Sequence, residues 1–173
     1  MHDVAIAIRV LQETGKIKTA MVIDTDVHQG NGTAGIFAGD ASVYTLSIHQ
    51  RDNYPHDKQQ SDLDIELDDH VGDGEYLEAL GKGLEVAFQQ MRPDLIAYVA
   101  GSDPYHEDKL GGLRLSMAGM LDRDLLVMRA AREREIPLFV TLAGGYAQKL
   151  EDTVELHANT ALALVQAMEG GAG

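Results

Sequence analysis

Two aspartates and a histidine, Asp24, Asp26 and His28, stand at alternate positions after an apolar segment. That segment, 20–23, is typical of a buried parallel strand, and the glycine-rich turn 30–32 ends it. Alternate side chains of an extended backbone share one face, so the carboxylates and the imidazole should project together. Such ligands suit Zn²⁺, Fe²⁺ or Mn²⁺. The pattern predicts a metal site, although a role for Asp26 in capping the next helix explains that residue almost as well.

Three more apolar segments of the chain are each followed by a loop with an unusual polar group. His49 follows the second segment, Asp103 and Asp108 follow the third, and Tyr146 follows the fourth. The carboxyl ends of parallel strands share one edge of a sheet, so these groups can converge on one pocket. Taken alone, Asp108 is better explained as a solvated loop acid, and Tyr146 as a rim aromatic packed on the sheet.

The elements that must position these groups alternate along the chain. Amphipathic helices are predicted over 3–14, 74–91, 116–134 and 150–168, a short helix or turn over 32–37, and strands over 20–23, 42–48, 63–67, 94–101 and 136–142. The strand 63–67 alternates apolar and acidic residues, as a short edge strand does. The order predicts one α/β domain over 1–173, with a mostly parallel sheet flanked by helices.

Composition restricts the classes of function. The 173 residues are enough for one domain with a core. There is no cysteine, so a metal must be held by His, Asp or Glu. The net charge of -14, from 28 acidic and 14 basic residues, argues against direct binding of nucleic acid and favours neutral or cationic ligands. No apolar run long enough for a bilayer and no signal peptide is seen, so we expect a cytoplasmic protein without a membrane partner.

Three motifs give the chain a resemblance to the histone deacetylase family. Segment 24–33, Asp-Thr-Asp-Val-His-Gln-Gly-Asn-Gly-Thr, resembles the family's Asp-x-Asp-x-His-[His/Gln]-Gly-[Asp/Asn]-Gly motif. Segment 101–113 resembles the loop with its last metal-binding aspartate, and segment 142–146, Leu-Ala-Gly-Gly-Tyr, resembles its Gly-Gly-Tyr loop. The motifs occur in the family's order over nearly the whole chain. Glutamine at position 29 is the residue type of the bacterial and class IV members, which the chain therefore resembles most. The resemblance implies the C-terminal part of the arginase/deacetylase fold.

The resemblance also implies a set of roles. Asp26, His28 and Asp108 would bind Zn²⁺, or Fe²⁺, so that the metal activates water and polarises an amide. Tyr146 would donate a hydrogen bond to the amide oxygen as it becomes an oxyanion. Asp103 would support its loop rather than bind the metal.

Further positions carry over with the same motifs. Gly144 and Gly145 would contact the substrate, which the resemblance identifies as an acylated lysine or polyamine. Asp24 and Ser47 would lie near the metal site and resemble the family's site for a monovalent cation, K⁺ or Na⁺.

One feature of the family is missing from this sequence. The family uses a tandem histidine pair as general base and acid, upstream of the segment at which this chain begins, and no His-His dipeptide occurs here. We therefore expect a partial domain that forms a homo-oligomer or binds a complementing N-terminal segment. Two functions stay open: a deacetylase, or an inactive fragment that acts as a metal-binding or interaction module. A metal-dependent glycosyltransferase using Asp24 and Asp26 ranks last, because it gives Tyr146 no role.

Overall fold

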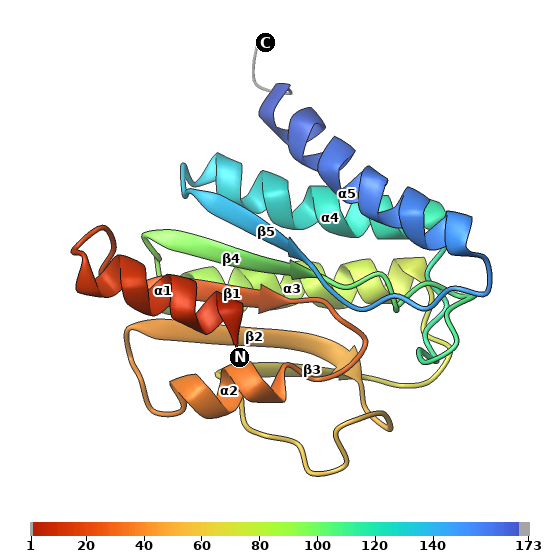
Figure 1. Cartoon of the computed structure of the whole chain (residues 1–173), viewed down its shortest axis with the longest axis horizontal. Coiled ribbons are helices and arrows are strands. Elements are labelled where there is room, and N and C mark those ends of the chain that lie inside the picture. The colour runs from red at the N-terminus through yellow and green to blue at the C-terminus, as the bar shows by residue number, and fades with distance from the viewer. Residues whose placement is uncertain (1, 170–173) are drawn as a thin grey trace.

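The computed structural model describes residues 2–169 and contains one sheet of five parallel strands in the order β3-β2-β1-β4-β5 (Figure 1). The strands are β1 (Ala20–Asp24), β2 (Val43–Gln50), β3 (Leu63–Leu67), β4 (Leu95–Ala100) and β5 (Leu138–Leu142). The helices are α1 (Asp3–Glu13), α2 (Asn31–Phe37), α3 (Asp73–Gln90), α4 (Met117–Glu133) and α5 (Leu150–Glu169). The α/β class and the parallel sheet are confirmed, and predicted bounds differ from these by no more than two residues.

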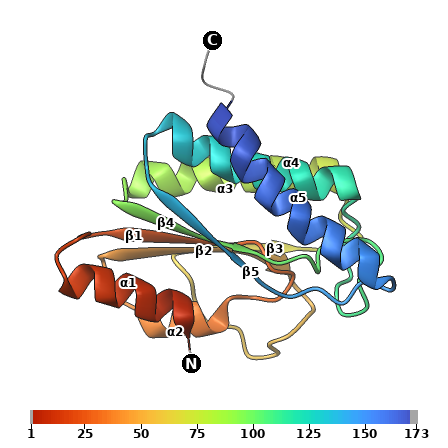
Figure 2. The ribbon, with the colours of Figure 1, turned by 45° about the horizontal axis from the view of Figure 1, so that its top comes forward.

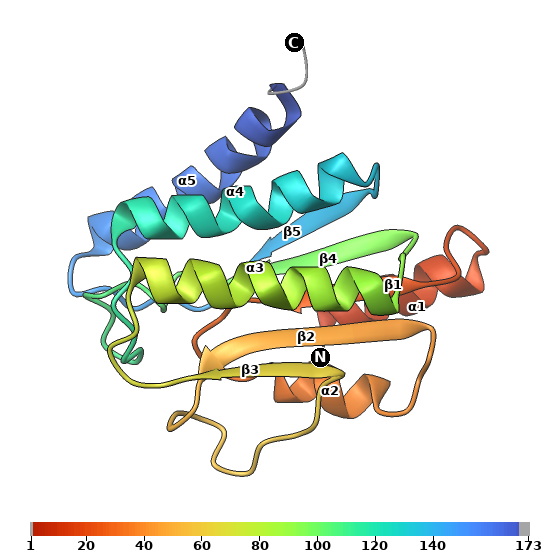
Figure 3. The same cartoon turned by 180° about the vertical axis from the view of Figure 1, so that it is seen from behind.

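Helices cover both faces of the sheet. The short helices α1 and α2 lie on one face, and α3, α4 and α5 lie on the other (Figure 2). Seen from behind, α3 and α4 run side by side over the sheet (Figure 3). The central strand β1 is buried on both sides: Met21 and Ile23 belong to the larger core under α3–α5, and Val22 to the smaller core under α1 and α2. This explains why the sequence of β1 is a continuous apolar run.

The last strand, β5, was predicted from an apolar segment of the kind that forms a buried strand, but it is not fully buried. It pairs only with β4, so it forms an edge of the sheet. Its residues are half-buried, and Leu142 at its end is exposed. An edge strand with apolar side chains can pair with another chain.

The parallel arrangement brings four loops to one edge of the sheet. In register, Asp24 at the end of β1 lies beside Ser47 of β2 and Val99 of β4, and Val99 lies beside Thr141 of β5. The loops after these strands therefore start close together, as the sequence predicts for a site at the carboxyl ends of the strands. Within residues 2–169, no helix has the length and apolar character needed to cross a membrane.

The larger core makes a direct prediction for stability. Leu46 of β2 is buried in it, so Leu46→Ala should lower the free energy of unfolding by about 2–5 kcal/mol through lost burial and a cavity. Urea denaturation measures this. The matched control is Leu162→Ala at an exposed position of α5, which should change stability by no more than about 0.5 kcal/mol. Equal effects of the two substitutions would contradict the packing described here.

Candidate metal centre

Asp26 and His28 lie in the loop that begins where β1 ends, at Asp24. The chain turns there because side-chain carboxylates accept the amides that follow them. Oδ1 of Asp24 accepts from the amide of Asp26 at 3.1 Å, and Oδ1 of Asp26 accepts from the amide of His28 at 3.0 Å. Asp26 and His28 are therefore brought together by a turn, not by the extended strand that their spacing suggested.

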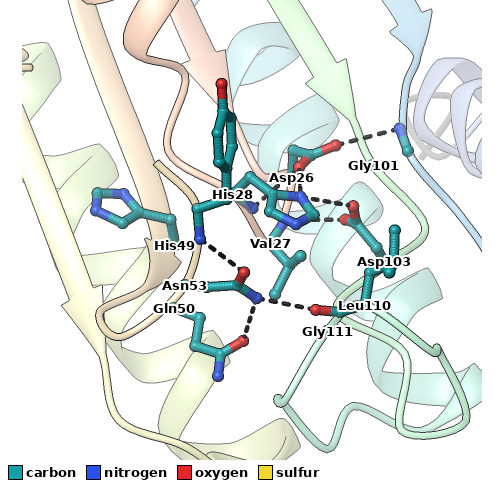
Figure 4. A network of polar contacts seen from close by, with 12 residues as sticks. Asp26, Val27, His28, His49, Gln50, Asn53, Gly101, Asp103, Leu110 and Gly111 are labelled. Carbon is teal, nitrogen blue, oxygen red and sulfur yellow. Dashed lines mark hydrogen bonds and ion pairs between the residues drawn. The ribbon is translucent and has the colours of Figure 1, made fainter. Parts of the chain in front are cut away.

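A third acid, Asp103, completes a compact group with these two residues. Nδ1 of His28 lies 2.9 Å from Oδ1 of Asp26 and 3.2 Å from Oδ2 of Asp103 (Figure 4). Ligand atoms of the three residues all lie within 4.8 Å of one another. Within the part of the chain described here, Asp26, His28 and Asp103 are the group with the geometry to hold a metal ion. We call it the Asp-His-Asp cluster.

The donor set of this cluster fits a divalent cation. Two carboxylates and an imidazole are suitable ligands for Zn²⁺ or Fe²⁺, and three protein ligands leave a position open. Oδ2 of Asp103 is buried and receives no hydrogen bond within residues 2–169, although it pairs with the imidazole of His28. A buried carboxylate oxygen without a donor is well placed to accept a cation in place of a proton.

Asp108 does not take the part that the family resemblance implied. Its Oδ1 accepts from the amides of Leu110 and Gly111 at 2.7 and 3.0 Å, and its Oδ2 accepts from the amide of Tyr146 at 2.5 Å. Both oxygens of Asp108 are thus used to shape two loops. Asp103, expected to support its loop, stands beside Asp26 and His28 in its place. It also accepts from the amide of Val27 at 2.8 Å.

Three close charges shift one another's titration. The carboxylate of Asp103 and then that of Asp26, both close to Nδ1 of the imidazole, favour its protonated form and raise the pKa of His28 to about 10. Burial raises the pKa of Asp103 to about 6, against the opposing effect of His28. Burial acts in the same direction on Asp26, but its hydrogen bonds with His28 outweigh it and lower the pKa of that carboxyl. The protonated imidazole of His28 thus places a positive charge between the two carboxylates.

Glycines allow the loops to close around the cluster. A Cβ atom on Gly144 would lie 2.4 Å from Oδ2 of Asp103 and 2.9 Å from Oδ2 of Asp26. A Cβ on Gly101 would lie 2.7 Å from the Cα of Asp26. The amide of Gly144 donates to Oδ2 of Asp26 at 3.1 Å, and Gly145 packs against Ser102. Gly144 therefore backs the cluster directly and Gly145 packs beside it, while the substrate contacts expected of both glycines remain a prediction.

Tyr146 is held in place by hydrogen bonds of its backbone, whereas its ring is largely exposed. Its amide donates to Asp108, its carbonyl accepts from the amide of Lys109 at 3.1 Å, and its side chain is 58% exposed. Asp108 thus fixes the loop that presents Tyr146. The role of the Tyr146 hydroxyl toward a substrate stays a prediction.

The positions expected to bind a monovalent cation, Asp24 and Ser47, are paired in register on β1 and β2. Burial, followed by the charge of Asp26, raises the pKa of Asp24 to about 8. The hydroxyl of Ser47 accepts from the amide of Gly30 at 3.3 Å and lies 2.9 Å from Nδ1 of the buried His49. Both residues therefore lie close to the loop of Asp26 and His28, and the cation itself remains a prediction.

Sequence reasoning missed two features of this region. The first is Asp103 as a member of the cluster, for which the signal was its place only three residues after the end of β4 at Ala100. The second is Arg123, a buried cation in α4. Arg123 is spaced three residues after Met120 and four before Val127, both of which are buried, so the helical period already placed it on the inner face.

Comparison with known proteins identifies the family of this chain. Residues 1–161 match the model of the histone deacetylase domain. The chain is 40% identical over 157 residues to an uncharacterised protein of Picosynechococcus, covering 91% of this chain and 52% of the relative. It is 37% identical over 147 residues to histone deacetylase 2 of Arabidopsis thaliana, covering 81% and 38%.

Solved structures show the same fold. An acetylpolyamine aminohydrolase from Burkholderia pseudomallei superposes with a TM-score of 0.80 at 20% identity, over 97% of this chain and 50% of that one. A histone deacetylase homologue complexed with SAHA superposes with a TM-score of 0.78 at 23% identity, over 97% and 46%. The chain thus spans about half or less of the length of these relatives. With its fold and the match over residues 1–161, it belongs to the histone deacetylase domain family.

Proposed function

We propose that this chain is the metal-bearing part of a zinc-dependent amidohydrolase that removes acyl groups from acyl-lysine or acylpolyamine. The observation that carries the proposal is the Asp-His-Asp cluster, which has Nδ1 of His28 within 3.2 Å of carboxylate oxygens of both Asp26 and Asp103. Membership of the deacetylase family supports the reaction class. Zn²⁺ is the proposed ion and Fe²⁺ the alternative, because this oxygen and imidazole set suits both.

Different residues of the chain would bind the metal, contact the substrate and position the loops. Asp26, His28 and Asp103 would hold the ion, which, when bound, supplies an acidic water and polarises the amide carbonyl. Tyr146 would donate a hydrogen bond to the carbonyl oxygen as negative charge develops on it. Asp108 would keep the Tyr146 loop in place through the amide of that residue.

The surroundings of the cluster suit an acylated alkylamine. The ring of Tyr54 is 63% exposed and stands edge-on to the ring of His28, with 6.3 Å between ring centroids. An exposed aromatic side chain beside a polar centre can pack against the methylene chain of a lysine or polyamine. The net charge of -14 favours approach of a cationic substrate.

General acid–base catalysis has no evident source within residues 2–169. His2 caps α1, because its Nδ1 accepts from the amide of Ala5 at 3.3 Å, and its Nε2 lies 3.0 Å from the hydroxyl of Thr33. His49 is buried and bonded to Ser47. We therefore propose that a complementing N-terminal segment, pairing with the open edge of β5, supplies the base, and that the isolated chain self-associates through that edge.

The identity of the third ligand can be tested by metal content. Asp103→Asn should abolish the binding of about one equivalent of Zn²⁺, since it removes one of three ligands. The matched substitution, Asp108→Asn, should leave the stoichiometry intact and lower the free energy of unfolding by about 1–3 kcal/mol, because it disturbs buried hydrogen bonds to backbone amides. Isothermal titration and elemental analysis measure the first effect, and urea denaturation the second. Retention of zinc by Asp103→Asn together with its loss in Asp108→Asn would make Asp108 the third ligand, as the family resemblance implied.

Zinc affinity should depend on pH. At neutral pH the imidazole of His28, with a pKa of about 10, carries a proton between Asp26 and Asp103, and a metal at the cluster must displace it. Affinity should therefore rise about tenfold per pH unit between pH values of about 6 and 8. It should fall more steeply below about 6, where Asp103 is also protonated. Competition against a chromophoric chelator measures this slope. An affinity that is independent of pH would place the metal elsewhere.

Activity provides the test of the function itself. The isolated zinc-loaded chain should hydrolyse a fluorogenic acetyl-lysine substrate or an acetylated polyamine slowly, because general acid–base catalysis contributes about 10²- to 10⁴-fold. Addition of the part of the Picosynechococcus relative that this chain does not match should restore turnover. In the complemented protein, Tyr146→Phe should lower kcat by about 100-fold or more with unchanged zinc content.

Two results would contradict this account in different ways. Fast turnover by the isolated chain, lost in His2→Ala, would make His2 the base. Zinc binding without hydrolysis in any combination would favour a metal-binding or interaction module.

A further inference from the structure

Arg123, in the second turn of α4, is a charged side chain inside the core. It is 1% exposed and lies on the face of the helix that packs toward the sheet. Burial of a guanidinium is costly unless its donors are fully used. The contacts that it makes therefore show what the fold gains from it.

Part of the guanidinium is paired with the neighbouring acid. Nε and Nη2 of Arg123 lie 2.9 and 2.7 Å from Oδ1 of Asp124, which is equally buried. Asp124 is in turn held by the hydroxyls of Tyr98 in β4 and Thr160 in α5, the latter at 2.6 Å from Oδ2. The ion pair is therefore fixed to the sheet and to a second helix, so that Arg123 has one available orientation.

The remaining donor points at the backbone beneath the Asp-His-Asp cluster. Nη1 of Arg123 donates to the carbonyl of Gly101 at 2.6 Å and lies 3.4 Å from the carbonyl of Thr25. Thr25 immediately precedes Asp26, and Gly101 stands two residues before Asp103. One guanidinium nitrogen thus connects the ends of β1 and β4, from which the two carboxylates of the cluster emerge.

We propose that Arg123 is a positioning residue that sets the separation of Asp26 and Asp103, and with it the metal affinity of the site. The proposal rests on the proposed metal-binding function. Groups that orient metal ligands from behind commonly change metal affinity by about 10- to 100-fold when they are replaced. Arginine suits the task because its planar fork can serve an acid and backbone carbonyls together, whereas lysine carries its charge at a single nitrogen.

The closeness of the two loops has a reporter inside the protein. The amide of Val27, next to Asp26, donates to Oδ1 of Asp103 at 2.8 Å. This hydrogen bond crosses directly from one loop to the other. Hydrogen exchange of the Val27 amide measures how readily this hydrogen bond opens, and it therefore reports on the contact between the two loops separately from any metal-binding measurement.

The test compares two Arg→Lys substitutions in one helix of the full chain. Arg123→Lys keeps the charge and removes the fork. Arg132→Lys is the matched control, because Arg132 also donates to a backbone carbonyl, that of Ala167 in α5, but makes no contact with either loop. For each variant we would measure Zn²⁺ affinity by chelator competition, the visible spectrum of bound Co²⁺, exchange of the Val27 amide, and the melting temperature.

Arg123→Lys should bind Zn²⁺ about 10- to 100-fold more weakly, alter the Co²⁺ spectrum and accelerate exchange at Val27. Arg132→Lys should match the parent chain in all three, whatever its melting temperature. If Arg123→Lys does not fold, the double variant Arg123→Met with Asp124→Leu removes the ion pair without leaving an unpaired charge, and the same changes are expected.

The inference is overturned if folded Arg123 variants keep the zinc affinity and the Val27 exchange of Arg132→Lys, since Arg123 would then serve stability alone. A parent chain that binds no zinc would refute the proposed function separately. In that case Val27 exchange still decides the role of Arg123, and an unchanged rate overturns it.

Discussion

The structure depends on the burial of negative charge where two adjacent parallel strands end. Asp26 and Asp103 are brought together after β1 and β4, and Asp24 is buried two residues away. Carboxylates at this separation repel one another unless a cation or a proton stands between them. The imidazole of His28 fills that place, and its closeness to Asp103 and Asp26 raises its pKa to about 10. A divalent cation would meet the same need with more charge.

Much of the surrounding sequence is explained by this constraint. Side chains at Gly101 and Gly144 would collide with Asp26 and Asp103. Arg123 supplies a buried positive group under the same two loops. The loops after three strands are thus closed over one point, and the parallel sheet provides the rigid frame on which they stand.

The fold could be predicted from the sequence because its signals are local. Apolar runs such as 20–23 and helical periods such as that of 74–91 reflect burial at each position, and the elements followed to within two residues. The exposure of β5 could not be predicted from its sequence, because it depends on how many neighbouring strands β5 has in the sheet. For the site, the sequence correctly brought together Asp26 and His28, which stand only two positions apart and contact each other. The choice between Asp103 and Asp108 as the third ligand depends on the path of an irregular loop, which the periodicity of the sequence does not encode. In the structure, Asp103 faces His28, whereas Asp108 accepts hydrogen bonds from three backbone amides.

The central claim is that a metal binds among Asp26, His28 and Asp103. A crystal of the chain grown with Zn²⁺, measured on both sides of the zinc absorption edge, tests it most directly. The account predicts one strong anomalous peak within about 2.0–2.2 Å of Nδ1 of His28 and of an oxygen from each aspartate. Two results would contradict it. One is a zinc ion coordinated by Asp108. The other is zinc found only at surface acids, with Nδ1 of His28 still in contact with Asp26 and Asp103.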